Sequence, residues 1–476
     1  MDMVIGGTAA QAADETWIDV TNPATGEHID RVPRGTREDV NAAVEAADAA
    51  FGAWSEKTLR ERGLFLYRAA ELIRRDYKDL AKILTTEQGK PLRESTDEVR
   101  GCANILEYYA SVAGQPAGEA VSLGKAGDCL VTRVPLGVCG AIIPWNMPVI
   151  IMGWKVGPAL LAGNTLVLKP ASATPLTNLK IALLLQEAGL PKGVLNVVTG
   201  PGETTGSALV QHPSIKKISF TGDCATGRRI REMAGSHIRA LTLELGGSDP
   251  MIVMADADIE KAVDGAIRGR FYNAGQICTA VKRLYLHEKI AGEFMRLLTV
   301  KLEGLKIGNG LLPHTDMGPL NSSEQLNRIR ATVDGTKERE EGTIRAGGCR
   351  ITGPGFDQGF FYSPTLIADV APDAAILRDE VFGPVLPVVT VPDLATAIRE
   401  ANRSKYGLGA SVWTKDIGTV KQVYRDVHAG IIWVNRHLTV PPEVPFGGTE
   451  ESGIGRENGS KALDSYTQSK TLYLGW

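Results

Sequence analysis

The 476-residue sequence has few features that would place it in a membrane, on a nucleic acid or in a disulfide framework. Its net charge is only −3, which gives no support to binding of nucleic acid or of a membrane surface. No segment approaches the roughly 20 apolar residues that span a bilayer, and residues 1–15 lack the basic and apolar regions of a signal peptide. Six scattered cysteines without CxxC or metal spacing favour reduced thiols, so we expect a cytoplasmic protein without a metal site.

The composition is that of an ordinary globular protein, with 43% apolar and 22% charged residues, and the length allows two or more large domains. The N-terminal region reads as a short strand and turn at 17–33 followed by helices at 37–54, 58–86 and 92–113. Residues 115–135 change character, because glycines punctuate short alternating runs. We expect a β-hairpin there that stands off the main body.

From Val138 onward, apolar runs alternate with helical stretches. The expected strands are 138–143, 165–169, 194–198, 216–220 and 240–244, and the expected helices are 148–162, 175–189, 204–211 and 225–234. This repetition predicts a parallel sheet covered on both faces. Five strands with four crossovers indicate a Rossmann-like domain, in which ligands bind at the carboxyl ends of the strands.

A second α/β unit is expected from about 250 to 435. Its predicted strands are 281–286, 384–391, 409–413 and 430–434, and its predicted helices are 256–272, 288–303, 392–402 and 416–427. The final segment, 466–474, alternates apolar and polar residues like an edge strand that needs a partner. The fold class is therefore α/β.

Cys278 lies in Asn273-Ala274-Gly275-Gln276-Ile277-Cys278-Thr279, after a glycine-containing turn and before an apolar run. This placement can hold a thiol at the mouth of a cleft, where it would serve as a nucleophile. A packed core cysteine is the alternative. We keep that alternative for the other five cysteines, which lack comparable surroundings: Cys102, Cys129, Cys139, Cys224 and Cys349.

Two polar residues beside turns accompany this thiol. Glu244 ends an apolar run just before Gly246-Gly247, where a carboxylate is costly unless it is paired or used. Asn146 lies in a Pro-Trp-Asn-Met-Pro turn, although asparagine is common in turns for backbone reasons alone. Together with Cys278 they form a candidate set of nucleophile, base and oxyanion donor.

Three further strand-end turns are candidates for a ligand site. The stretch 200–206, Gly-Pro-Gly-Glu-Thr-Thr-Gly, joins a strand to a helix, where backbone N–H groups can face phosphates. It is not GxGxxG, and a plain tight turn explains it equally. The second turn is Phe220-Thr221-Gly222-Asp223, where Thr221 or Asp223 can cap the next helix. In the third, Lys169 either reaches a ribose or is merely solvated.

Taken together, these motifs resemble the aldehyde dehydrogenase superfamily over nearly the whole chain. The matching motifs, in order, are Pro144-Trp145-Asn146, Phe220-Thr221-Gly222, Glu244-Leu245-Gly246-Gly247, Gly275-Gln276-Ile277-Cys278, Glu380-Val381-Phe382-Gly383-Pro384 and Pro445-Phe446-Gly447-Gly448. The resemblance implies an NAD(P)-binding domain (1–114 and 136–246), a catalytic domain (247–450) and a small β bridging domain (115–135 and 451–476). It also implies a homodimer or homotetramer built by strand exchange.

The resemblance implies a non-acylating oxidation of an aldehyde by NAD(P)⁺. Cys278 would attack the aldehyde carbon to give a thiohemiacetal, with Asn146 and the Cys278 backbone N–H stabilising the oxyanion. Hydride would pass to the nicotinamide, and water activated by Glu244 would hydrolyse the resulting thioester. Relatives that pass the thioester to coenzyme A lack a base at the Glu244 position, so its presence argues against that alternative.

Family positions for the cofactor also carry over to this sequence. Glu380 and Phe382 resemble the residues that hold the nicotinamide ribose, and Lys169 resembles the ligand of the adenosine ribose. The other candidate cofactor residues are Ile142, Trp145, Ser172, Gly202, Phe220, Thr221, Gly222, Asp223 and Leu245.

Three positions depart from common family patterns: Asp223 replaces a serine, Ser172 a glutamate typical of NAD-preferring members, and Glu450 a lysine. Asp223 brings an anion near the expected pyrophosphate. Since Ser172 cannot repel a 2′-phosphate, we expect NAD or NADP to serve as cofactor, with NADP accepted.

The matching substrate positions are uncharged: Met147, Ile151, Trp154, Tyr272, Ile277, Thr279, Val440 and Phe446. They favour an aromatic or medium-chain aliphatic aldehyde. One alternative is a hydroxyaldehyde or semialdehyde held by Arg436. Another, of a different class, is a non-enzymatic crystallin-like protein on the same fold.

Overall fold

The alternating apolar runs after Val138 form a parallel sheet in the computed structural model, which describes residues 1–114 and 118–475. Its five parallel strands lie in the order β9-β8-β7-β10-β11. They are β7 (Val138–Ile142), β8 (Thr165–Lys169), β9 (Leu195–Val197), β10 (Lys217–Thr221) and β11 (Ala240–Glu244). The expected Rossmann-like sheet is therefore confirmed. Its strand order reverses between β7 and β10, where such sheets bind ligands.

Both faces of this sheet are covered, because side chains of a strand alternate between faces. In β7, Cys139 and Ala141 enter a core shared with α2, α4, α5 and α6, whereas Val138 and Ile142 enter one shared with α1, α7 and α8. The helices of this lobe are α1 (Arg37–Ser55), α2 (Leu59–Arg75), α3 (Tyr77–Gln88), α4 (Leu92–Val112), α5 (Pro148–Leu161), α6 (Leu176–Glu187), α7 (Ser207–Gln211) and α8 (Cys224–Ala234).

Two expected helices differ in detail. The segment 58–86 is not one helix but two, α2 and α3, because Asp76 leaves the helical conformation with φ −102° and ψ 11°. Aspartate competes with helical hydrogen bonds through its own side chain, which favours such breaks. The segment 204–211 begins as a wide π-type turn, Gly202–Gly206, before α7.

Short antiparallel strands extend the sheet at both edges. The hairpin of β1 (Met3–Ile5) and β2 (Thr8–Ala10) pairs with β9, and β21 (Gly453–Ile454) pairs with β11. Strands of two or three residues are too short to show a period in the sequence, so they were not predicted. Although the sequence division assigned 453–454 to the bridging unit, these residues lie in the Rossmann-like sheet.

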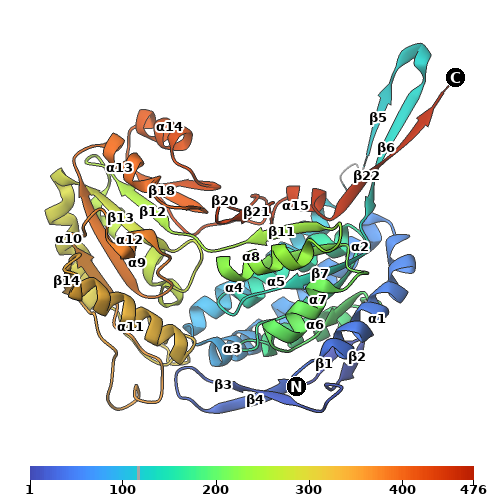
Figure 1. The fold of residues 1–476 in the computed structure, drawn as a ribbon, viewed down its shortest axis with the longest axis horizontal. Coiled ribbons are helices and arrows are strands. Elements are labelled where there is room, and N and C mark those ends of the chain that lie inside the picture. Colours follow the sequence, from blue (N-terminus) through green and yellow to red (C-terminus); the bar gives the residue numbers. More distant parts are fainter. Residues whose placement is uncertain (115–117, 476) are drawn as a thin grey trace.

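The second lobe contains a seven-stranded sheet in the order β14-β15-β16-β13-β12-β18-β19, parallel except for β14 (Figure 1). Its strands are β12 (Asp249–Val253), β13 (Val281–His287), β14 (Thr343–Ala346), β15 (Thr365–Ala368), β16 (Val385–Val391), β18 (Gly409–Trp413) and β19 (Ile431–Val434). Its helices are α9 (Ile259–Phe271), α10 (Glu288–Glu303), α11 (Ser323–Glu338), α12 (Ala375–Arg378), α13 (Leu394–Ala401) and α14 (Ile417–Asp426). The second α/β unit is confirmed, with β12, β14, β15, α11 and α12 as additions.

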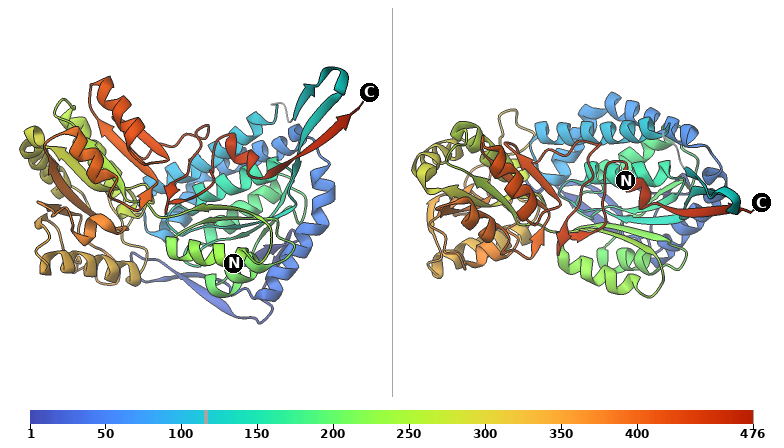
Figure 2. Two further views of the ribbon diagram at one scale, coloured as in Figure 1. Left: turned by 45° about the horizontal axis from the view of Figure 1, so that its top comes forward. Right: turned by 90° about the horizontal axis from the view of Figure 1, so that it is seen from above.

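A three-stranded sheet projects from the first lobe as a narrow arm that ends near the C-terminus (Figures 1 and 2). It consists of β5 (Gly118–Ser122), β6 (Asp128–Pro135) and β22 (Thr467–Leu474), in the order β22-β6-β5. β22 runs antiparallel to β6 from Thr467 opposite Pro135 to Leu474 opposite Asp128. The expected hairpin and C-terminal edge strand therefore meet, while 115–117 of that prediction lie outside the described residues.

The remaining short elements connect these units. The predicted strand and turn at 17–33 is a hairpin of β3 (Trp17–Thr21) and β4 (His28–Pro33). Near the end of the chain, β17 (Tyr406–Gly407) pairs with β20 (Thr449–Glu450), and α15 (Lys461–Asp464) precedes β22.

Candidate active site

The turn that leads to Cys278 is held in an unusual backbone conformation. After α9, Asn273 and Ala274 both adopt left-handed conformations, with φ 50° and 52°. Such conformations persist only where neighbours hold them. Asn273 is buried, and its N–H donates to Glu94 Oε2 at 2.8 Å, while Gln88 Nε2 donates to its Oδ1 at 3.0 Å. Residues of α3 and α4 thus hold the nucleophile loop of the other lobe.

Gly275 is required where this loop meets the segment 380–383. Its φ is 74°, and a Cβ at this position would lie 2.3 Å from the carbonyl oxygen of Gly383. Arg270 of α9, fully buried, donates to the carbonyl oxygens of Val381 and Gly383. The loop with the thiol and the segment with Glu380 and Phe382 are therefore packed against each other.

Asn146 approaches the thiol loop from the turn after β7. Its side chain is buried, and Nδ2 donates to the Gln276 carbonyl oxygen at 2.9 Å. Its own carbonyl oxygen accepts from Lys90 Nζ at 2.7 Å and from Asn273 Nδ2 at 3.0 Å. Since a side-chain amide has two N–H donors, one remains for a ligand oxygen.

Glu244 is the last residue of β11 and is only 2% exposed. Neither carboxyl oxygen has a hydrogen-bond partner in the described part of the chain. Burial, followed by the nearby Glu457, raises the pKa of Glu244 well above its usual value. A Cβ at Gly447 would lie 2.6 Å from Glu244 Oε1, so the glycine leaves space beside the carboxyl group. A buried, unpartnered carboxyl group with a raised pKa has the properties of a general base or acid.

The Cys278 thiol is partly exposed. Burial raises its pKa to about 12, and the charges of Asp249, Glu380 and Glu244 add to this, whereas the Lys282 ammonium opposes it. Only the thiolate is an efficient nucleophile, so this thiol needs a proton acceptor when it reacts. Glu244 is one of the carboxyl groups whose charge acts on the thiol.

A cavity of about 380 Å³ opens onto Cys278. All eight predicted substrate residues line it: Met147, Ile151, Trp154, Tyr272, Ile277, Thr279, Val440 and Phe446. The Trp154 and Phe446 rings face each other with centroids 4.9 Å apart and an interplanar angle of 34°. The walls next to the thiol are therefore mainly apolar and aromatic, which suits an apolar ligand.

Sequence reasoning missed five residues that also line this cavity: Asp97, Glu98, Ile150, Arg268 and Leu438. Glu98 is buried and already engaged, because it pairs with Lys90 Nζ at 2.5 Å and accepts from Val149 N at 2.8 Å. Asp97 and Arg268 are exposed and place one charge of each sign on the cavity wall. Asp97 lies three residues after the buried Glu94 on α4, so both residues share one face of that helix. This spacing is the signal in the sequence that would have placed Asp97 near the cavity wall.

Arg436, the alternative substrate residue, is exposed and is not among the residues that line this cavity. The alternative in which Arg436 holds the substrate therefore has no contact in this structure that supports it. It lies between Asn435 and His437, and only His437 turns inward, where Nε2 donates to the Thr279 carbonyl oxygen at 2.7 Å. Burial lowers the pKa of His437 to about 4, so its ring is neutral at physiological pH.

On the other side of the thiol, Glu380 and Phe382 face residues of the first lobe. Glu380 Oε1 accepts from Gly247 N at 3.1 Å and pairs with Lys282 Nζ at 3.0 Å. The Phe382 ring meets Trp145 edge to face, with centroids 5.6 Å apart. The structure thus brings the predicted nicotinamide-ribose residues together with Trp145, one residue before Asn146.

Lys169 is the last residue of β8, and Ser172 lies just beyond that end of the strand. Lys169 is buried, its Nζ donates to the Pro170 carbonyl oxygen at 3.0 Å, and burial lowers its pKa to about 8. Ser172 Oγ donates to the Gly200 carbonyl oxygen at 3.0 Å. A Cβ at Gly202 would meet nothing within 4 Å, so there is open space beside the 200–206 turn that Ser172 contacts.

The remaining predicted cofactor residues lie at the ends of β7, β10 and β11. Ile142, Phe220 and Leu245 share one apolar core. Thr221 Oγ1 is buried without a hydrogen-bond partner among the described residues. Asp223 caps α8, accepting from Thr226 N at 2.9 Å and Thr226 Oγ1 at 2.7 Å.

These ends fit a dinucleotide. A Cβ at Gly222 would lie 2.4 Å from the Phe220 ring, so only a residue without a side chain fits this turn. The unpartnered Thr221 hydroxyl and the open space at Gly202 suit a polar ligand. The Asp223 carboxylate caps α8 at this end of the sheet.

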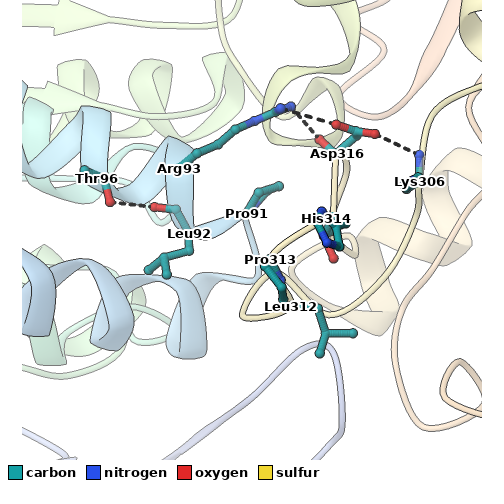
Figure 3. A pocket seen from close by; sticks show the side chains of 10 residues that line it. Pro91, Leu92, Arg93, Thr96, Lys306, Leu312, Pro313, His314 and Asp316 are labelled. Atoms are coloured by element: carbon teal, nitrogen blue, oxygen red, sulfur yellow. Dashed lines mark hydrogen bonds and ion pairs between the residues drawn. The ribbon is translucent and has the colours of Figure 1, made fainter.

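A second cavity, of about 530 Å³, lies between the start of α4 and the segment 306–316 (Figure 3). Figure 3 shows Arg93 reaching toward Asp316, with a distance of 3.3 Å between Nη1 and Oδ1. No residue predicted for the site is among the described residues that line it. The described residues also include no group of three or more His, Cys, Asp or Glu that would hold a metal ion, and no helix long and apolar enough to cross a membrane.

Comparison with known proteins relates this geometry to a family. Residues 9–472 match the model of the aldehyde dehydrogenase family. The chain is 42% identical to phenylacetaldehyde dehydrogenase of Pseudomonas fluorescens, over 100% of this chain and 96% of that protein. Betaine aldehyde dehydrogenase from Staphylococcus aureus in complex with NAD⁺ is 36% identical, with a TM-score of 0.97 over 100% of this chain and 95% of that chain. An NADP-dependent enzyme of E. coli is 35% identical, with a TM-score of 0.97 over 100% and 98% of the two chains.

Proposed function

The chain belongs to the aldehyde dehydrogenase family, and we propose that it oxidises aromatic or medium-chain aliphatic aldehydes to carboxylic acids. As a member of this family it is an NAD(P)-dependent enzyme. One observation carries the proposal: the Cys278 thiol lines a cavity of about 380 Å³ whose walls are mainly apolar and aromatic. Such walls stabilise a ligand by removing apolar surface from water.

Cys278 is the nucleophile in this proposal. Its sulfur attacks the aldehyde carbon to form a thiohemiacetal, and the thiol proton passes to a nearby base. The free N–H of the Asn146 amide and the Cys278 backbone N–H donate to the oxygen that gains negative charge. Because Asn146 is buried and fixed by Gln276, these donors need little reorganisation during the reaction.

Glu244 is the base that activates water against the thioester on Cys278. Its raised pKa and its lack of partners allow it to take a proton from water, which an ion-paired carboxylate does poorly. Hydrolysis by water agrees with a non-acylating enzyme. A base at this position also argues against transfer of the thioester to coenzyme A.

The cofactor site is proposed along the carboxyl ends of the Rossmann-like sheet. When bound, NAD(P)⁺ supplies the hydride acceptor. Glu380 and Phe382 would hold the nicotinamide ribose, and Lys169 and Ser172 the adenosine ribose. Ile142, Trp145, Gly202, Phe220, Thr221, Gly222, Asp223 and Leu245 complete the proposed groove. Ser172 bears no charge, so the 2′-phosphate of NADP⁺ meets no repulsion from this side chain.

A second candidate substrate is a cationic aldehyde such as betaine aldehyde. Aromatic faces at Trp154, Tyr272 and Phe446 attract a quaternary ammonium group, and the Asp97 carboxylate on the cavity wall adds to this. Arg268 on the same wall opposes it, so the apolar aldehyde stays first. For an anionic semialdehyde, the cations to test are Arg268, which lines the cavity, and Arg436, the alternative from the sequence.

A homodimer or homotetramer is also part of the proposal. The projecting arm exposes apolar side chains that a partner subunit would cover: Val121, Leu130, Leu472 and Tyr473, each 42–55% exposed. The division into an NAD(P)-binding domain, a catalytic domain and a bridging domain remains a proposal, with the arm as the bridging part. A cytoplasmic location agrees with six free thiols, one of them the proposed nucleophile.

The test is formation of NAD(P)H, followed by absorbance, with a panel of aldehydes and both cofactors. The panel contains phenylacetaldehyde, benzaldehyde, hexanal, betaine aldehyde, lactaldehyde and succinic semialdehyde. We expect the highest kcat/KM with the first three. No turnover with any aldehyde would favour a non-enzymatic, crystallin-like role, and a preference for succinic semialdehyde would overturn the apolar assignment.

A further inference from the structure

Lys282 is a buried cation beside the proposed active site. It is the second residue of β13, four residues after Cys278, and only 1% exposed. Its ammonium group lies 2.9 Å from the Ile277 carbonyl oxygen and 2.5 Å from that of Cys278. It also lies 3.0 Å from Glu380 Oε1. One side chain therefore joins the nucleophile loop to the segment proposed to hold the cofactor.

The contact with Ile277 determines how one peptide group is oriented. The Ile277 carbonyl and the Cys278 N–H belong to the same planar, trans peptide, so they point in opposite directions. While Lys282 Nζ holds the carbonyl, the N–H points away from the lysine. This N–H is a proposed oxyanion donor. A rotation of the peptide would replace the donor by a carbonyl oxygen, which repels an oxyanion.

The contact with Glu380 leaves its two carboxyl oxygens with different surroundings. Oε1 is held by Lys282 Nζ and by Gly247 N at 3.1 Å. Oε2 has no such bond to Lys282 and remains available to accept from ribose hydroxyls. A carboxylate held through one oxygen by a buried ammonium group loses little rotational freedom when it binds a ligand.

We propose that Lys282 is a positioning residue that aligns the Cys278 backbone N–H with the oxyanion and fixes Glu380 for the nicotinamide ribose. This inference rests on the proposed roles of Cys278 and Glu380. Lys282 couples the nucleophile loop to Glu380, because the same ammonium group contacts the Ile277 carbonyl oxygen and the Glu380 carboxylate. It is not itself in contact with the aldehyde cavity, since it is not among the residues that line it.

The matched control is Lys217, a buried lysine away from the nucleophile loop and Glu380. Lys217 is also 1% exposed, but it begins β10 at the end opposite the proposed cofactor site. Its Nζ donates to Thr242 Oγ1 at 2.5 Å and lies 4.7 Å from the centroid of the Tyr466 ring. Lys217→Met removes a buried ammonium group without touching the nucleophile loop or Glu380.

The first experiment measures dissociation constants of NADH and NADPH by fluorescence in a double-mutant cycle of Lys282→Met and Glu380→Gln. We expect Lys282→Met to raise Kd about tenfold for whichever cofactor wild type binds more tightly, which corresponds to about 1.4 kcal/mol of binding free energy. In the Glu380→Gln background the same change should have little further effect, because Lys282 acts through that carboxylate. Equal effects of Lys282→Met in both backgrounds would overturn the assignment.

The second experiment measures the rate of alkylation of Cys278 by iodoacetamide without cofactor, at one fixed pH well below the pKa of the thiol. Charged groups around the thiol are Lys282, Asp249, Glu380 and Glu244, and only Lys282 is a cation. Its removal raises the pKa of the thiol, so the thiolate fraction and the alkylation rate at this pH should fall by at least about tenfold in Lys282→Met. Lys217→Met should keep the wild-type alkylation rate and Kd, and a fall of similar size there would also overturn the assignment.

Lys282→Gln separates the two roles and serves if Lys282→Met does not fold. Its amide still donates to a carbonyl oxygen but cannot form the ion pair, so Kd should rise while kcat falls less than in Lys282→Met. Unchanged Kd and alkylation in both variants would refute the inference even if wild type oxidises aldehydes. If wild type oxidises none but both shifts appear, the proposed function fails and the positioning role of Lys282 stands.

Discussion

The side-chain amide of Asn146 donates a 2.9 Å hydrogen bond to the carbonyl oxygen of Gln276, two residues before Cys278. The bond links the turn after β7 in one lobe to the nucleophile loop in the other. It uses one of the two amide hydrogens and leaves the other for a ligand. The position of the proposed oxyanion donor is therefore set by contacts between the two lobes.

Replacing Asn146 should reduce turnover without preventing folding. We expect Asn146→Ala to lower kcat by about 10²- to 10³-fold, as loss of one oxyanion donor does elsewhere. The measurement is steady-state NAD(P)H formation, with thermal unfolding followed in parallel. Asn196→Ala removes a buried asparagine that bonds Gly6 and Gly193 instead, and it should keep most of kcat. Similar losses in both variants would contradict the assigned role.

Cys278→Ser should abolish oxidation of aldehydes. A hydroxyl group is a far weaker nucleophile than a thiolate, so kcat should fall by at least about a thousandfold. Cys349→Ser changes an exposed cysteine that does not line the cavity beside Cys278 and should retain activity. Substantial turnover by Cys278→Ser in the same absorbance assay would refute the mechanism.

Glu244→Gln should slow release of the acid more than formation of the thioester. In rapid mixing we expect a burst near one NAD(P)H per site and then slow turnover, unless the same base also deprotonates the thiol. Because burial raises the pKa of Glu244, the active, deprotonated form appears only at higher pH than for an ordinary carboxylate. The kcat of wild type should therefore rise with pH through that raised pKa, and Glu244→Gln should lack this rise.

Glu87→Gln is the matched control for that pH profile. Glu87 is buried, burial raises its pKa to about 7, and it accepts hydrogen bonds from Leu176 N and Thr177 N. It lies outside the cavity beside Cys278. The rise of kcat with pH should persist in this variant. If the rise disappeared in Glu87→Gln, the titration would not belong to Glu244.

Ser172→Glu should change cofactor preference. A carboxylate at this position repels the 2′-phosphate of NADP⁺ and accepts from the ribose hydroxyls of NAD⁺. We expect kcat/KM to fall more for NADP⁺ than for NAD⁺, with Ser172→Ala leaving the ratio nearly unchanged. A wild type that uses NAD⁺ alone would show that another contact excludes the phosphate.

Asp97→Asn distinguishes the two candidate substrates. The Asp97 carboxylate lies on the cavity wall and attracts a cationic aldehyde but contributes little to an apolar one. We expect KM for betaine aldehyde to rise and KM for phenylacetaldehyde to stay nearly constant. Trp154→Ala, which removes one aromatic wall, should raise KM for both substrates. An increase confined to betaine aldehyde in Trp154→Ala would argue against an apolar aldehyde.

The sequence by itself determined the α/β class, the five parallel strands and the set of turns from which the candidate residues come. Continuous apolar runs indicate which strands are buried on both faces. Each run can be recognised within its own short segment of sequence, without knowledge of the residues that pack against it. The resemblance to the family also predicted eight residues that line one cavity, because the family positions carry the same fold.

Only the tertiary structure decided which charged residues reach that cavity. Arg436 is near Phe446 in sequence but lies outside, while Asp97 and Arg268 come from α4 and α9 and line the wall. The contacts of Lys282 with Ile277, Cys278 and Glu380 likewise join residues up to about a hundred positions apart. The physical reason is that burial and charge pairing depend on which elements pack together, and local periodicity does not record that packing.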